Sequence, residues 1–414
     1  MGVKDKLIMN ISSEVLEMAS RICRDYMNGA WKMISSKEIV VKKISGGLNN
    51  LLYLVALPSS HKSSPSEPSQ VLLRLYGQIH GEQVIESLLT ESVIFTLLSE
   101  RGLGPKLYGV FPGGRLEQYI PARPLKTTEL SDPTLSALIA ENLAKIHAMN
   151  IPINKRSNWL WNTISRWLKT AVVNLEDIHA EDSHNQQIIK KLQHLNLSKE
   201  FEWLRHFLTQ TSSPVVFCHN DLQEGNILLS HCDAENDKVS QPQLSFIDFE
   251  YSAYNYRGFD FANHFIEWTI DYTNNQFPYF SVNRNCYPSR EQQLLFARAY
   301  LQHSCDQNCD NPTEEQEAAL LEEVEMFTLA SHFLWGLWSI VNAKISTICF
   351  GYWDFALARL EAYHDLKNSI TRTRRISAKN EDKTDETILR CFQVTVFRKI
   401  LRGEKENFIS FVVC

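Results

Sequence analysis

The stretch VVFCHNDLQEGNILL at 215–229 decides the fold of this chain, together with LSFIDFE at 244–250. Both stretches contain apolar segments rich in β-branched and aromatic residues. These segments predict strands on either side of the polar loop at 230–243. Asp221 and Asn226 lie within the first run, and Asp248 lies near the end of the second. Phosphoryl transfer needs one carboxylate to orient the attacking hydroxyl, and an amide oxygen with a second carboxylate to hold a metal ion. The pattern therefore predicts a phosphoryl-transfer site.

The interval between Asp221 and Asn226 matches the catalytic loop of protein kinases, and Asp248 stands where their metal-binding aspartate would. The alternative is that Asp221 and Asn226 only cap turns, as these residue types often do. A second strand that leads to Asp248, and a small β-rich unit upstream, favour the catalytic interpretation because they supply its structural context.

The chain divides into a small β-rich lobe at 1–120, a larger and mostly helical lobe at 121–369, and a tail at 370–414 whose role is open. The first lobe contains a helical lead-in at 12–33, a helix at 82–100, and strands at 38–45, 51–57, 71–77, 106–112 and 114–120. Pro121 and Pro124 end this lobe and form a hinge. Beyond residue 130 the pattern is helical, and a capping box of Thr313 and Gln316 opens one long helix. We therefore expect a two-lobed α+β fold.

The small lobe offers residues for a nucleotide. The polar link between its first two strands reads as a hairpin turn, yet its glycine backbone could approach phosphates closely; it comprises Ser45, Gly46, Gly47, Leu48, Asn49 and Asn50. Arg74 on the third strand is the expected cation, and Glu91 lies inside the apolar stripe of the next helix, so we expect the two to pair. A purely structural salt bridge is the alternative. Backbone groups around Gln118 and Ile120 would face adenine.

Composition excludes several classes of protein. Lysine and arginine number 42 against 48 acidic residues, a net charge of −6, which lacks the basic footprint of a nucleic-acid binder. Uninterrupted apolar runs are too short for a membrane helix, so we expect no membrane span. Nine cysteines without framework spacing indicate free thiols in a reducing compartment.

Longer blocks resemble one known family. The sequences CHNDLQEGNILL (218–229) and FIDFEYSAYNYRGFDFANHFIEW (246–268) are similar to the two signature blocks of choline/ethanolamine kinases, and LLRLYG, GLGPKLYGVFPGGRLEQYIP and SHFLWGLWSIVNAKIS resemble further blocks. The likeness runs from about residue 20 to about 367, and QEGN, NYRGFD and WGLWS look like the choline kinase branch. It implies a protein-kinase-like fold, ATP and Mg²⁺ dependence, a cytoplasmic homodimer, and phosphorylation of choline as the first step toward phosphatidylcholine.

The resemblance also implies roles for individual residues. Asp221 stands as the catalytic base, Gln223 near the substrate hydroxyl, and Asn226 with Asp248 as Mg²⁺ ligands. Glu250 occupies the position of a protein-kinase glycine, so details of the metal site can differ. The positions that surround the choline ammonium in the family are Tyr251, Glu267, Tyr272, Trp335, Trp338, Phe350 and Phe355, the last standing where a tyrosine is expected.

Rival interpretations share most of these residues. A kinase of ethanolamine or of aminoglycosides would use the same Asp221, Asn226 and Asp248, so only the acceptor pocket discriminates. A non-catalytic scaffold with a kinase-like fold is a rival from another class, because fold alone does not prove activity. Without the resemblance, Trp335 and Trp338 would be read as core residues of an amphipathic helix.

Overall fold

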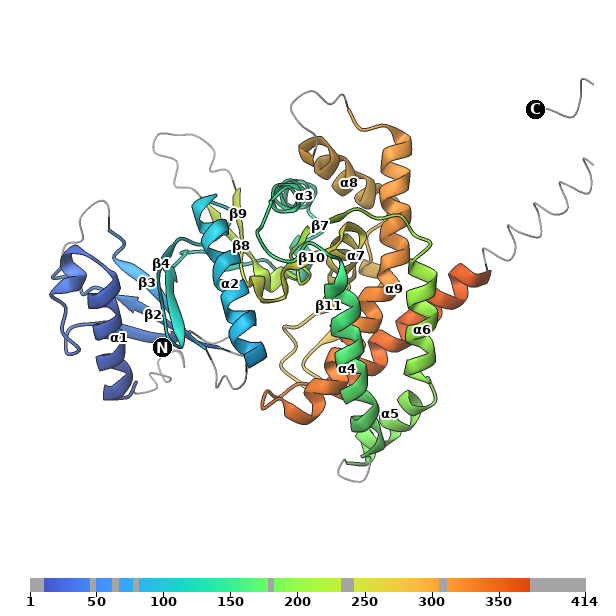
Figure 1. Ribbon diagram of the computed structural model, residues 1–414, viewed down its shortest axis with the longest axis horizontal. Helices are drawn as coiled ribbons and strands as arrows, with labels where there is room; N and C mark the ends of the chain where they lie inside the picture. Colours follow the sequence, from blue (N-terminus) through green and yellow to red (C-terminus); the bar gives the residue numbers. More distant parts are fainter. Residues whose placement is uncertain are drawn as a thin grey trace, which may run out of the picture.

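The structure is a computed structural model that describes residues 11–44, 50–61, 67–76, 82–177, 182–231, 242–304 and 311–372. A smaller lobe built around a β-sheet lies beside a larger lobe that is mostly helical (Figure 1). The predicted α+β, two-lobed fold class is therefore confirmed.

An antiparallel sheet of five strands, in the order β1-β2-β3-β5-β4, forms the small lobe. The predicted hairpin of the first two strands is present, with Val41 opposite Val55. One apolar cluster fills this lobe around Trp31, which is fully buried and donates its indole N–H to the Pro68 carbonyl at 2.8 Å. The elements are α1 (Ser13–Tyr26), η1 (Gly29–Lys32), β1 (Val40–Ile44), β2 (Asn50–Ala56), β3 (Gln70–Tyr76), β4 (Leu107–Phe111) and β5 (Gly114–Gln118).

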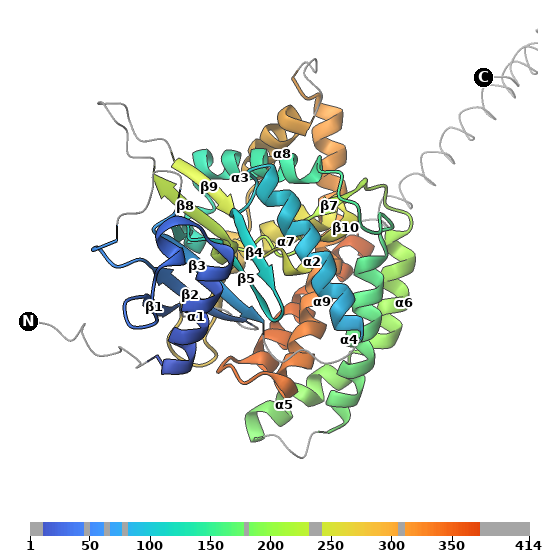
Figure 2. The same ribbon diagram turned by 60° about the vertical axis from the view of Figure 1, so that its left-hand side comes forward.

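Helix α2 (Glu82–Glu100) connects the lobes physically. It runs between the sheet and the helical lobe (Figures 1 and 2). Ile94 and Leu98 on this helix are buried in the apolar cluster of the larger lobe, although the helix precedes β4 and β5 of the small lobe in the chain. The helix therefore packs on both lobes, and its Glu91 contacts Arg115 of the small-lobe sheet.

Short strands build the part of the large lobe that faces the sheet (Figure 2). The chain leaves β5 at Gln118, and its next strand pairs with β8, so the passage between lobes falls between residues 118 and 123. These elements are β6 (Arg123–Pro124), η2 (Thr127–Glu129), β7 (Val215–Cys218), η3 (Glu224–Asn226), β8 (Ile227–His231), β9 (Pro242–Phe246), η4 (Phe249–Tyr251), β10 (Ala253–Tyr256), β11 (Ile270–Asp271), β12 (Ser281–Val282) and η5 (Arg284–Cys286).

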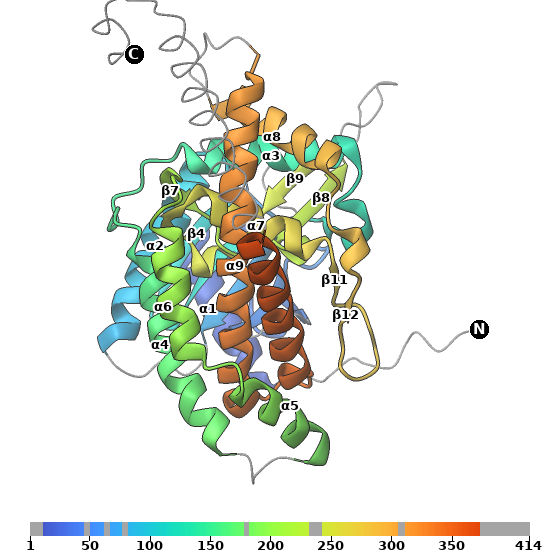
Figure 3. The same ribbon diagram turned by 90° about the vertical axis from the view of Figure 1, so that its right-hand side faces the viewer.

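Long helices form the remainder of the large lobe, with α9 at their centre (Figure 3). The predicted capping box opens α9: Thr313 N–H donates to Gln316 Oε1 at 3.0 Å, and Gln316 N–H donates to Thr313 Oγ1 at 3.3 Å. The helices are α3 (Pro133–His147), α4 (Asn158–Glu176), α5 (Ser183–Gln193), α6 (Leu197–Leu208), α7 (Arg257–Glu267), α8 (Arg290–Ser304), α9 (Glu314–Ile345) and a final helix over 352–372.

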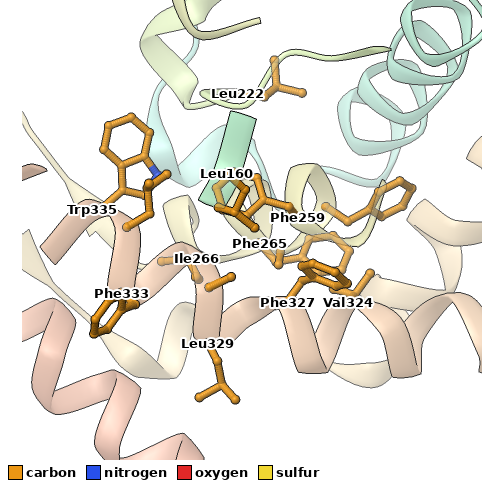
Figure 4. Packing of buried hydrophobic residues seen from close by; sticks show 14 of the residues in the cluster. Leu160, Leu222, Phe259, Phe265, Ile266, Val324, Phe327, Leu329, Phe333 and Trp335 are labelled. Atoms are coloured by element: carbon orange, nitrogen blue, oxygen red, sulfur yellow. The ribbon is translucent and has the colours of Figure 1, made fainter. Parts of the chain in front are cut away.

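The packing of α7 against α9 supplies much of the core, shown in Figure 4. Phe259 and Phe265 from α7, and Phe327 and Phe333 from α9, are all fully buried. Full burial of such a side chain stabilises the fold by about 1.5–3 kcal/mol. The same helix pair carries residues of the candidate site, so core packing and site geometry are linked.

Helix α9 is long and apolar enough to cross a membrane, alone among the helices in the described part of the chain. Its apolar window is 83% buried inside the protein. Burial of this kind is what the central helix of a folded lobe requires, so the finding does not contradict the expectation of no membrane span.

The final helix continues through residue 372, past the boundary at 369 that the sequence suggested. Ile370 on its last described turn is buried, and Lys367 Nζ contacts Glu200 Oε2 at 2.5 Å. The last described turn therefore packs on the large lobe, and the segment whose role is open begins after residue 372.

Gly258 tests how closely α7 and α9 pack. A Cβ at this position would lie 2.9 Å from Phe327 Cδ2 and 3.1 Å from the Glu323 carbonyl oxygen. Gly258→Ala should lower the free energy of unfolding by about 1–3 kcal/mol, because overpacking forces backbone shifts. Glycine-to-alanine changes inside helices usually stabilise by about 0.5–1 kcal/mol. Urea unfolding distinguishes the two signs, and a more stable variant would contradict the close packing.

Candidate active site

One buried carboxylate holds the predicted catalytic loop, residues 219–226, in place. Asp260, on α7, is fully buried and accepts the backbone N–H of His219 at 2.8 Å and that of Asn220 at 2.6 Å. His147 from α3 contacts the same carboxylate at 2.9 Å. Burial alone would raise the pKa of Asp260, but His147 and His219 beside it hold that pKa below its usual value. An ionised Asp260 thus fixes the loop before Asp221.

Asn220 adopts a left-handed backbone with φ of 67°, a conformation that Asn tolerates better than most residues. Its side chain donates to the Tyr251 carbonyl at 2.8 Å and accepts from Asn255 Nδ2 at 2.8 Å. These bonds hold the turn that presents Asp221. Tyr251, one of the predicted acceptor residues, is thereby fastened next to the catalytic loop.

Asp221 and Asn226 meet as the kinase pattern predicts. Asn226 Nδ2 donates to the Asp221 carbonyl at 2.9 Å and to Asp221 Oδ2 at 3.1 Å. Because the amide nitrogen is used in this way, the Asn226 Oδ1 oxygen is turned from Asp221. Gln223 caps the short η3 turn between them, with its Oε1 accepting from Gly225 N–H at 3.0 Å.

Asp248 follows β9 and lies beside Asn226 in the chain fold. The Ile247 N–H donates to the Asn226 carbonyl at 3.0 Å, which joins the two segments. Asp248 itself has a left-handed backbone with φ of 64°, and its side chain is 37% exposed. The amide oxygen of Asn226 and the carboxylate of Asp248 are hard oxygen donors, the kind that a divalent cation such as Mg²⁺ takes. This donor set fits a metal ion.

Acidic groups crowd the centre. The pKa of Asp221 is raised well above its usual value, first by burial and then by the charges of Glu267, Asp248 and Glu250. Like charges at such a site are stable together when cations join them. The arrangement is therefore suited to a metal ion on one side of Asp221 and a cationic substrate on the other.

The expected ion pair of Arg74 with Glu91 is replaced by a larger network. Glu91 accepts from Arg115 Nη1 at 2.5 Å. Arg74 Nε donates to Glu117 Oε1 at 3.3 Å, while its Nη1 lies 3.6 Å from Asp248 Oδ1. Arg115 Nε donates to the other oxygen of Glu117 at 2.7 Å. A continuous network of ion pairs therefore joins Glu91 of α2 to Asp248, the predicted metal ligand. Its intermediate members are Arg115, Glu117 and Arg74.

Strand register explains the difference. Arg74 on β3 lies directly opposite Arg115 on β5, and Glu117 follows two residues later on the same face. Two neighbouring guanidinium groups that are nearly fully buried need a carboxylate between them. Burial alone would raise the pKa of Glu117, but Arg74 and Arg115 hold it below its usual value. Alternating Arg and Glu in an otherwise apolar strand was the signal that sequence reasoning passed over.

Other residues assigned to the nucleotide are placed as follows. Residues 45–49 of the glycine-rich link lie outside the described residues. Asn50 begins β2, where its backbone pairs opposite Tyr76. Gln118 ends β5, and its Oε1 accepts from the Lys106 N–H at 3.1 Å. Ile120 lies in the passage between the lobes, and its carbonyl accepts from the Ala122 N–H at 2.8 Å.

Aromatic rings from four segments gather near the Asp221 loop. Tyr251 and Trp335 meet edge to face with ring centroids 5.5 Å apart, and Trp335 and Trp338 do so at 5.7 Å. Tyr272 lies 6.4 Å from Phe350 and 6.2 Å from Phe355. The structure therefore brings all the aromatic residues predicted for the acceptor into one assembly, which we call the aromatic pocket: Tyr251, Tyr272, Trp335, Trp338, Phe350 and Phe355.

Residues that the sequence did not suggest complete this pocket. Tyr352 bridges its two halves, with its ring 5.8 Å from Trp338 and 5.0 Å from Phe350. Phe280 packs on Phe350 at 5.3 Å and Phe355 at 5.2 Å. Tyr352 supplies a hydroxyl three residues before Phe355, but that hydroxyl hydrogen-bonds to Ser346.

One carboxylate lies among these rings. Glu267, at the end of α7, is 3% exposed, and burial raises its pKa. Its Oε1 accepts from Arg359 Nη1 at 3.3 Å, and its Oε2 accepts from the Tyr272 hydroxyl at 2.9 Å. Arg359 also donates to the Ser331 carbonyl and hydroxyl, which fixes the guanidinium. Arg359 is another residue missed from the sequence, since a lone arginine in a polar helical stretch gave no signal.

A buried trio with metal-ligand atoms, His147, Cys218 and Asp260, lies behind the catalytic loop. The Cys218 thiol donates to the Asn255 carbonyl at 3.5 Å, and burial raises its pKa well above the usual value. A thiol that stays protonated is a poor metal ligand. Asp260 and His147 of this trio therefore brace the loop by hydrogen bonds.

Comparison with known proteins now places the chain. The profile of the family described as choline/ethanolamine kinase matches residues 41–364. The chain is 46% identical to a choline/ethanolamine kinase of Homo sapiens, over 89% of this chain and 90% of that protein. It is 46% identical to choline kinase alpha of Mus musculus, over 84% and 80%. This chain belongs to the choline/ethanolamine kinase family.

The solved structure of a choline kinase from Cryptosporidium parvum matches with a TM-score of 0.67 and 29% identity, over 86% of this chain and 96% of that one. Membership in the choline/ethanolamine kinase family confirms the resemblance, and it makes the chain a transferase that takes phosphate from ATP and works with a divalent metal ion. It also sets aside the scaffold interpretation, since curated relatives are kinases.

A double-mutant cycle tests the arginine network. Arg115→Met and Glu91→Gln should be coupled by more than about 0.5 kcal/mol in urea unfolding, because residues in direct contact are not additive. Arg74→Met with Glu91→Gln serves as the matched cycle and should show a smaller coupling, since Arg74 contacts Glu117 and Asp248. Stronger coupling in the Arg74 cycle would restore the original pairing.

Proposed function

We propose that this chain is a choline kinase, which transfers the terminal phosphoryl group of ATP to the hydroxyl of choline. The supporting observation is a buried carboxylate, Glu267, whose partner Tyr272 belongs to the cluster of aromatic rings near the Asp221 loop. A quaternary ammonium has no N–H donor, so aromatic faces and a nearby negative charge are the forces that can recognise it.

The protein's own donors already use part of the hydrogen-bond acceptor capacity around the pocket. Both oxygens of Glu267 accept hydrogen bonds, from Arg359 and from Tyr272. Asn263 Oδ1 accepts from the Ser331 hydroxyl at 2.8 Å and from Trp335 Nε1 at 2.7 Å. A primary ammonium such as that of ethanolamine needs acceptors for three N–H groups. The pocket therefore favours choline, and ethanolamine is the weaker acceptor.

The chemical step follows from the placement of Asp221. Its carboxylate accepts the proton of the choline hydroxyl as the oxygen forms a bond to the γ-phosphorus of ATP and the bond from that phosphorus to the bridging oxygen breaks, which releases ADP. A raised pKa makes Asp221 a stronger proton acceptor than an exposed aspartate. Asn226 Nδ2 holds the carboxylate in position.

We assign the metal as Mg²⁺, held by Asn226 and Asp248. When bound it supplies positive charge against the phosphates of ATP. Arg74 lies 3.6 Å from Asp248 and so brings a further cation to the same region from the small lobe.

A coupled assay of ADP release tests the proposal. Choline, ethanolamine and no acceptor are compared at saturating ATP and Mg²⁺. At equal, limiting concentrations of acceptor, turnover should be faster with choline than with ethanolamine. A higher kcat/KM for ethanolamine would make the chain an ethanolamine kinase, and equal rates with and without acceptor would remove both assignments.

Replacement of the base should abolish turnover. Asp221→Asn keeps the shape of the side chain but cannot accept the proton, so kcat should fall by roughly 10²–10⁴. Circular dichroism and the melting temperature control for folding. A variant with kcat near that of the wild type at saturating ATP and Mg²⁺ would show that this loop is not catalytic.

Trp335 distinguishes a cation-binding pocket from simple core packing. Trp335→Phe should raise KM for choline by up to roughly thirtyfold, which corresponds to about 2 kcal/mol of cation–π attraction, while KM for ATP stays constant. Trp353→Phe is the matched control, because Trp353 is buried outside the aromatic pocket. An unchanged KM for choline in Trp335→Phe would return that residue to a purely structural role.

A further inference from the structure

A cavity of about 740 Å³ lies between α8, α9, the end of α7 and the final helix. This volume is within the range of small-molecule sites, roughly 300–1,000 Å³. The cavity shares Phe355 with the aromatic pocket and is lined by Arg359, which holds Glu267. Phe355 and Arg359 therefore form a wall that the cavity shares with the aromatic pocket.

The walls of this cavity are mainly apolar. Ile266, Ile270, Leu321 and Val324 are buried residues that line it. Exposed residues that line it carry both signs of charge and so leave little net charge at its mouth; they are Arg284, Arg290, Glu325, Glu361 and Asp365. An occupant should thus have an apolar body.

Two residues of the lining each have one buried nitrogen atom without a hydrogen-bond partner in the described part of the chain. Arg359 is 2% exposed, and its two terminal nitrogens bond to Glu267 and Ser331, but its Nε has no partner. His332 Nδ1 is likewise buried and unpaired. The pKa of His332 is lowered far below its usual value by burial, then by Arg359 and Arg284, so the ring is neutral and can donate from one nitrogen. Buried donors of this kind call for an acceptor.

We propose that this cavity binds an amphipathic monocarboxylate. The carboxylate accepts hydrogen bonds from Arg359 Nε and from His332 Nδ1, and the hydrocarbon body lies against the apolar walls. A carboxylate suits the site because its two oxygens can take both donors and its charge complements the guanidinium. An alcohol of the same length keeps the apolar contact but loses the charge.

The geometry also fixes the sign of a coupling, and this part rests on the proposed choline acceptor. An anion beside Arg359 offsets the positive charge that faces Glu267, so the aromatic pocket becomes more negative and attracts a cation more strongly. Carboxylate and choline should therefore strengthen each other's binding by the same factor, as thermodynamic linkage requires.

Calorimetric titration of the full chain with octanoate tests the site, with octan-1-ol as the control ligand. Octanoate should bind with one site per chain and at least tenfold more tightly than octan-1-ol. Saturating choline should tighten octanoate binding at least threefold. Absence of binding, or equal affinity for the alcohol, would overturn the carboxylate site whatever the acceptor of the kinase proves to be.

A cavity-filling variant locates the binding. Ala358 lines the cavity and is partly exposed, so Ala358→Trp should reduce octanoate affinity at least tenfold. Asn368→Trp adds the same side chain to the same helix at an exposed position outside the lining and should leave octanoate affinity unchanged. If Ala358→Trp does not fold, Ala362→Met fills the same space. Unchanged affinity in the folded cavity variant would overturn the location.

The coupling arm separates this inference from the proposed function. Suppose that the chain phosphorylates choline and binds octanoate in the cavity. If the affinity for octanoate is then the same with and without choline, the two sites are not coupled and this part of the inference is wrong. If choline is not phosphorylated at all, the proposed function fails, while the direct titration still decides the carboxylate site.

Discussion

Helix α7 fixes the spacing between the two halves of the site, because the buried carboxylate of Asp260 anchors the helix to the loop that precedes Asp221. Asp260 accepts two backbone N–H groups of the catalytic loop, and Glu267 stands seven residues later on the same helix. At 1.5 Å per residue and 3.6 residues per turn, the two carboxylates lie on one face, separated by roughly 10 Å along the axis. The distance from Asp221 to the ammonium site therefore depends on one rigid helix packed on α9.

The negative charges of the site carboxylates are a second constraint on the site. Burial, followed by the charges of Glu267 and Asp248, raises the pKa of Asp221. In the proposed reaction, a metal ion at Asp248 and a quaternary ammonium at Glu267 offset these negative charges. Arg74 and Arg359 hold the outer carboxylates without neutralising the base between them. The cationic groups of the proposed reaction thus complement the negative charge of these carboxylates.

The sequence predicted those features of the fold that depend on residues close together in the chain. Two β-rich runs around a polar link predicted the hairpin of β1 and β2, and the capping box predicted the start of α9. The interval from Asp221 to Asn226 predicted that these two side chains meet. The sequence could not predict the pairing of Arg115 with Glu91, because that choice depends on cross-strand register and on where α2 packs. The roles of Arg359 and Asp260 were missed for the same reason, since their partners are remote in the chain.

The central claim is that Glu267 recognises the positive charge of choline, and its most direct measurement is discrimination against a neutral analogue. In 3,3-dimethylbutan-1-ol a carbon atom replaces the ammonium nitrogen, with nearly the same shape. Wild-type protein should bind choline at least tenfold more tightly than this alcohol. Glu267→Gln should lose most of that preference while its affinity for the alcohol stays within about twofold. Equal preference in both proteins would show that the charge of Glu267 does not recognise choline.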